Sequence, residues 1–86
     1  MKKIIVKVQP FTMQQTVFAY EDGNKIDAIE TNFDNFCESI LFLSEKYNIT
    51  EVELLGIANF SQWIGEKLVK AELEKYNKNT LQIKYM

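Results

Sequence analysis

The sequence predicts an α/β (α+β) domain, a five-stranded mixed sheet with two helices on one face. Three observations support it. A tight-turn signal, Asp22-Gly23, separates two segments rich in β-branched and aromatic residues. A short apolar segment, 52–57, leads into a run with helical spacing of its apolar residues. The last segment, 81–85, alternates apolar and polar residues, as a half-buried strand does.

The first half of the chain predicts three antiparallel strands, 3–8, 12–21 and 25–30. Pro10 ends the first, since proline cannot donate to a strand ladder. A two-residue turn at Asp22-Gly23 pairs the flanking residues in order. The expected pairs are Tyr20 with Lys25, Ala19 with Ile26, Phe18 with Asp27 and Val17 with Ala28.

A first helix is expected from Asn32, its N-cap, to about Tyr47, with Asn48 as a left-handed stop. Turn and cap chemistry accounts for the acidic residues near its start, which are Asp27, Glu30 and Asp34. The strand 52–57 follows, and Asn59 caps a second helix, 60–76.

With the first strand central, the natural sheet order is 3-2-1-4-5, and right-handed crossovers put both helices on the same face. The other face then combines apolar centres with polar edges, as contact surfaces often do. The candidate interaction face comprises Ile5, Lys7, Phe18, Tyr20, Leu55 and Lys84. The alternative is a solvated face with scattered apolar residues.

The turn after the fourth predicted strand is the best pocket candidate, with Gly56, Asn59 and Ser61. It sets the amides of a helix start beyond the carboxyl end of a strand, where open α/β sheets bind ligands. A plain strand-to-helix turn is the alternative, because the segment has no glycine-rich phosphate loop.

Composition excludes several kinds of chemistry for this single domain, residues 1–86. The chain has no histidine, all ten of its cations are lysines, and its net charge is −2. The commonest general base and metal ligand are therefore missing, as is the arginine fork for phosphate. Cys37 is the one cysteine and reads as a buried apolar residue. We expect no catalytic residues, no cofactor and no metal site, and nucleic acid is an unfavourable partner.

Glu51 and Glu53 share one face of a strand and could bind metal or add solubility at the start of that strand. No apolar run approaches the ~18 residues of a membrane span. Lys7 interrupts the apolar residues after Met1-Lys2-Lys3, so no secretory signal is expected and the predicted location is cytoplasmic.

The predicted order, a three-stranded meander followed by helix, strand, helix and strand, resembles the ribonuclease H-like fold over nearly the whole chain. Active members of that superfamily hold divalent metal with clustered acids, beginning with an aspartate in the first strand. Here the strand 3–8 has no acid, the end of the fourth strand, where another acid is expected, offers Ala58 and Asn59, and only Glu38 matches a family carboxylate. The resemblance therefore implies the fold without the nuclease activity.

Three functions remain as hypotheses. The first is a non-catalytic protein-interaction domain that forms a homodimer or binds a larger partner, with a composition similar to phage and mobile-element accessory proteins. The second is a ligand-binding or enzymatic domain that uses the Gly56–Ser61 turn. The third is a nucleic-acid-binding accessory protein, which the acidic balance disfavours.

Overall fold

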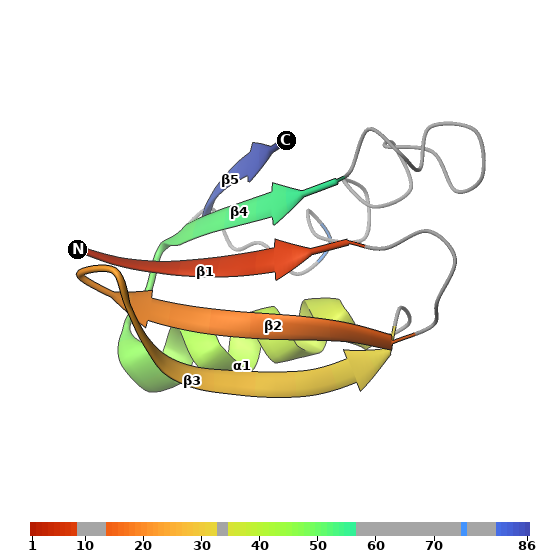
Figure 1. The fold of residues 1–86 in the computed structure, drawn as a ribbon, viewed down its shortest axis with the longest axis horizontal. Helices are drawn as coiled ribbons and strands as arrows, with labels where there is room; N and C mark the ends of the chain where they lie inside the picture. Colours follow the sequence, from red (N-terminus) through yellow and green to blue (C-terminus); the bar gives the residue numbers. More distant parts are fainter. Residues whose placement is uncertain (9–13, 33–34, 57–74, 76–80) are drawn as a thin grey trace.

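A computed structural model describes residues 1–8, 14–32, 35–56, 75 and 81–86 (Figure 1). Its elements are β1 (Lys2–Lys7), β2 (Gln14–Glu21), β3 (Asn24–Asn32), α1 (Phe36–Tyr47), β4 (Glu51–Leu55) and β5 (Gln82–Tyr85). The five strands form one mixed sheet in the order β3-β2-β1-β4-β5, which confirms the predicted order. β2 is antiparallel to β1 and β3, whereas β4 is parallel to β1 and β5. Apart from Lys75, the second predicted helix lies outside the described residues.

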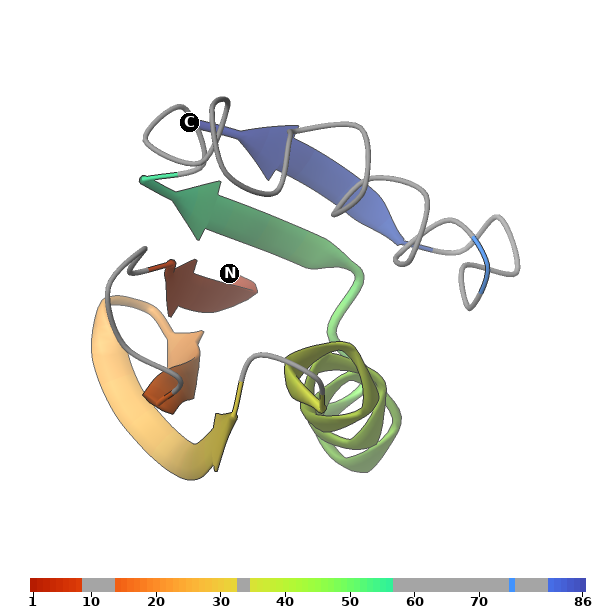
Figure 2. The same ribbon diagram turned by 90° about the vertical axis from the view of Figure 1, so that its right-hand side faces the viewer.

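The helix α1 lies on one face of the sheet, against β1, β2 and β3, and Figure 2 shows it on one side of the strands. Side chains alternate along a strand, so every second residue of the inner strands lies on the same face of the sheet as α1. Those positions hold Ile4, Val6, Val17, Ala19, Val52 and Leu54, all 0–1% exposed. The helix supplies Phe36, Cys37, Ile40 and Leu43 to the same core. Cys37 is buried, as its sequence context predicts.

The turn between β2 and β3 follows the predicted chemistry. Asp22 has φ 52° and Gly23 has φ 81°, and two central residues with positive φ are what a type I′ hairpin turn requires. Tyr20 pairs with Lys25 across this turn, as predicted.

Beyond that pair the predicted register is wrong. The structure has a bulge between Ala19 and Tyr20, after which Ala19 pairs with Asp27, Phe18 with Ala28 and Val17 with Ile29. Ile26 and Ile29 are three residues apart, so an uninterrupted strand would point them to opposite faces. The extra residue lets both isoleucines pack against the core beneath α1.

The predicted N-cap is also wrong. Asn32 ends β3, and α1 begins at Phe36 after Asn35, whose side chain makes no cap hydrogen bond. The Asn32 Oδ1 accepts a hydrogen bond from the Asn35 N–H at 2.9 Å, so it serves the turn before the helix instead. At the other end Asn48 has φ 56° and its N–H donates to the Ser44 carbonyl, which confirms the left-handed stop.

Candidate interaction face

The sheet face turned away from α1 is named the open face here, and Figure 1 shows the sheet from this side. Strand register decides its members, because paired residues point the same way. Ile5 pairs with both Phe18 and Glu53, Lys3 with Tyr20, Lys7 with Leu55, and Glu53 with Lys84. All six predicted residues, Ile5, Lys7, Phe18, Tyr20, Leu55 and Lys84, therefore lie on the open face. In the described part of the chain, no helix lies over them.

The open face forms a grid of three rows that cross the strands. In the order β3 to β5, the register gives a first row of Lys25, Tyr20, Lys3, Glu51 and Gln82. The second row is Ala28, Phe18, Ile5, Glu53 and Lys84. The third begins Glu30, Thr16, Lys7 and Leu55.

An apolar centre lies on this grid at Phe18, Tyr20, Ile5 and Leu55. Each of the four is half-buried, so part of its apolar surface stays in contact with water. The rings of Phe18 and Tyr20 lie 6.2 Å apart between centroids, tilted at 49°. Edge-tilted aromatic pairs at this distance attract each other and hold both rings in place.

Charges surround that centre in both signs. The Lys3 Nζ lies 3.4 Å from Glu53 Oε2, and the Lys25 Nζ lies 5.3 Å from the centroid of the Phe18 ring. Glu53 thus has a lysine partner on the neighbouring strand. Among the described residues, no group of three or more His, Cys, Asp or Glu side chains is placed to hold a metal ion.

The second candidate site is only partly described. Gly56 directly follows β4 with φ 84°, a left-handed conformation that glycine adopts without strain. Asn59 and Ser61 lie outside the described residues, so the structure does not bring these three predicted residues together.

A polar cleft of about 490 Å³ lies at the end of the sheet where β2 begins and β3 ends. Its described lining is Gln14, Gln15, Thr16, Glu30, Thr31, Asn32 and Asn35. Sequence reasoning missed this cleft because its two sides come from strand ends paired through the Gln14–Asn32 register.

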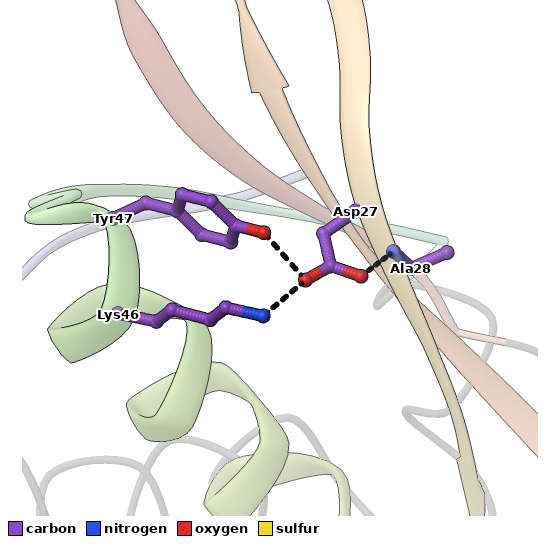
Figure 3. Close-up of polar contacts among 4 residues, drawn as sticks. All are labelled: Asp27, Ala28, Lys46 and Tyr47. Carbon is purple, nitrogen blue, oxygen red and sulfur yellow. Dashed lines mark hydrogen bonds and ion pairs between the residues drawn. The ribbon is translucent and has the colours of Figure 1, made fainter.

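A cluster of polar side chains joins β3 to the C-terminal end of α1 (Figure 3). The Asp27 Oδ2 accepts hydrogen bonds from the Tyr47 hydroxyl at 2.7 Å and from the Lys46 Nζ at 3.2 Å. The other oxygen, Oδ1, accepts the Ala28 N–H at 2.8 Å. The Tyr47 hydroxyl, the Ala28 amide and Lys46 together hold the pKa of Asp27 below its usual value. In return, hydrogen bonding to Asp27 raises the pKa values of Lys46 and Tyr47.

The interpretation of Asp27 as a turn or cap residue was therefore wrong. The bulge moves Asp27 to the face that α1 covers, where its partners lie at the far end of the helix. Glu30 lies on the open face, and Asp34 lies outside the described residues.

Comparisons of this chain with protein-family models, curated proteins and solved structures found no match. The observed fold is thus an α/β fold with a five-stranded mixed sheet, and the ribonuclease H-like assignment stays a prediction.

In the part of the chain that the structure describes, no helix is both long enough and apolar enough to cross a membrane.

Proposed function

We propose that this protein is a non-catalytic interaction domain that associates with a second copy of itself through the open face. The observation that carries the proposal is the apolar centre of that face, formed by Ile5, Phe18, Tyr20 and Leu55. These side chains come from three neighbouring strands, on the side of the sheet away from α1.

The energetic argument rests on the apolar area that association removes from water. Each square ångström of apolar surface buried contributes about 25 cal/mol, so covering four large half-exposed side chains on each copy favours contact. Interfaces also have an apolar centre and a polar rim, and lysines and glutamates surround this centre on the grid. A second copy is a fitting partner because the face carries both signs of charge, including Lys3, Lys25, Glu51 and Glu53.

Size-exclusion chromatography with light scattering tests the proposal. We expect a dimer at about 100 μM, in the range where modest interfaces associate. The double variant Ile5→Thr/Phe18→Thr should be monomeric, because threonine keeps the strand preference while removing the apolar contact.

The matched control is Phe42→Gln, which removes a 56% exposed aromatic side chain from α1, outside the open face. It should leave the dimer intact. An unmodified protein that stays monomeric throughout the accessible concentration range would contradict the proposed function.

We also propose the ribonuclease H-like arrangement for residues 1–86, with a second helix beside α1 on the covered face. The strand order and the parallel pairing of β1 with β4 and of β4 with β5 support it. Backbone assignment by NMR, with contacts measured from residues 60–76, tests this arrangement. Contacts from that segment to Ile5 and Phe18 would contradict both this proposal and the free open face.

A further inference from the structure

We infer that the second copy packs on the open face about a two-fold axis that runs parallel to the strands, between β1 and β2. This inference rests on the proposed function and specifies its geometry. Rotation about this axis sets β1 of one copy on β2 of the other, and β4 on β3. Ile5 of each copy then contacts Phe18 of the other, and Lys25 of each copy faces Glu51 of the other.

The grid of the open face supplies the argument. Ile5 and Phe18 are direct cross-strand neighbours in the second row, so an axis between their strands exchanges them. The same rotation exchanges Lys3 with Tyr20, which gives a lysine against an aromatic face. In the first row it also exchanges Lys25 with Glu51. Ile5 and Phe18 of the apolar centre thus meet each other, and the unlike charges of Lys25 and Glu51 meet at the rim.

Axes perpendicular to the strands give poorer contacts. An axis centred on the second row stacks Lys3 of one copy on Lys7 of the other. It also stacks Glu53 on Glu53 and Lys84 on Lys84 of the second copy. Moving the axis by half a row in one direction sets Glu51 against Glu53. Moving it in the other direction sets Ile5 against Lys7. Like charges that face each other across an interface disfavour association.

The other axes parallel to the strands are also poorer. An axis along β1 stacks Lys3 on Lys3 and Lys7 on Lys7 of the second copy. An axis along β4 likewise stacks Glu51 on Glu51 and Glu53 on Glu53. An axis between β1 and β4 sets Ile5 on Glu53, and an axis along β2 sets Lys3 on Lys25. The axis between β1 and β2 opposes no like charges, and its least favourable contact sets Leu55 on the aliphatic stem of Glu30.

Lys25 and Glu51 make this geometry testable because they are far apart within one chain. They lie three strand positions apart, roughly 14 Å at ~4.8 Å per strand. That exceeds the Debye length of ~8 Å at physiological ionic strength, so the two charges interact little within a monomer. Any compensation between changes at these two positions therefore arises between copies.

The experiment measures dimer dissociation constants by sedimentation equilibrium for Lys25→Glu, Glu51→Lys and the double variant. Each single change creates two repelling pairs by symmetry, and we expect it to raise the dissociation constant about tenfold. An equimolar mixture of the two single variants should form a heterodimer with nearly the original affinity. The double variant should form a homodimer whose dissociation constant is close to that of the original protein. Glu45→Lys is the control, because it reverses an exposed charge on α1, away from the open face, and its dissociation constant should stay within about twofold of the original.

The outcomes separate this geometry from the proposed function. If Ile5→Thr/Phe18→Thr abolishes the dimer but the mixture of charge variants does not recover affinity, the axis is wrong and the interaction face stands. If Glu45→Lys weakens the dimer as strongly as Lys25→Glu, the charge effect does not come from the contact between Lys25 and Glu51, and this geometry is overturned. A monomeric unmodified protein would overturn the proposed function and this inference together.

Discussion

At the scale of single residues, Asp27 links the two layers of the fold. Its carboxylate accepts hydrogen bonds from a tyrosine, a lysine and a backbone amide, and the first two belong to the last turn of α1. The folded protein lowers the pKa of Asp27, so its stabilising effect is present above the unfolded pKa, near 3.8. This stabilisation is lost as the pH falls through the lowered pKa that Asp27 has in the folded protein.

The substitution Asp27→Asn should therefore flatten the acid side of the stability curve. We expect the melting temperature of the original protein to fall more steeply below about pH 4 than that of the variant, since the asparagine side chain has no charge to lose. Thermal denaturation at a series of pH values measures this difference. Glu30→Gln, a change to an exposed carboxylate of the same strand, serves as the control. Parallel curves for the Asp27 variant and the original protein would show that Asp27 does not contribute.

At the scale of elements, the β2–β3 hairpin decides which residues face the core. Its type I′ turn fixes the first pairs, and the bulge then shifts Ile29 towards α1 and Ala28 to the open face. Without the bulge, Ile29 would lie on the open face and Asp27 would oppose Phe18. The hairpin thus sets both the anchoring of α1 and the composition of the open face.

The turn itself can be tested with Gly23→Ala. A methyl group at Gly23 would meet no atom within 4 Å, but its φ of +81° strains any residue with a side chain. We expect a loss of about 1–2 kcal/mol in the free energy of unfolding, which urea denaturation measures. Gly23→Asn should lose less, because asparagine tolerates positive φ, as Asn48 does in this protein. Equal losses for both variants would mean that the strain lies elsewhere.

The sequence predicted the turn and the end of α1 from neighbouring residues, but it misplaced the start of α1 and failed where distant contacts decide the structure. The tight turn at Asp22-Gly23 and the helix stop at Asn48 were predicted correctly, because their φ values follow from local chemistry. The bulge was missed because it depends on Ile26 and Ile29 both reaching a core built by other elements. Asp27 was misread for the same reason, since its partners lie 19 and 20 residues later. The shared face of Ile5 and Phe18 follows from alternation and register, whereas its binding role stays a prediction.

At the scale of the whole molecule, the two faces of the sheet are buried unequally: residues of the inner strands on the side of α1, such as Ile4 and Val17, are 0% exposed, while the open face keeps half-buried apolar residues. If a second copy covers that side, the folded state gains stability by mass action. At a free concentration 100 times the dissociation constant, the gain is ~2.7 kcal/mol.

The melting temperature should therefore rise with protein concentration. Across a hundredfold range we expect an increase of several degrees, because ~1 kcal/mol shifts the melting temperature of a small domain by about 4–8 °C. Differential scanning calorimetry measures it. Ile5→Thr/Phe18→Thr should melt at one temperature throughout. A concentration dependence that persists in this double variant would point to contact through another surface.

The central position of β1 has a consequence for how the chain reaches its folded state. The hairpin and α1 join residues close in sequence and can form early, but Ile4 must find Val52 before the β1–β4 pair exists. Closing so long a loop is slow, so refolding should take milliseconds to seconds rather than microseconds. During that delay β1 can recruit strands from other chains, which makes rapid dilution at low concentration the safer route to native protein.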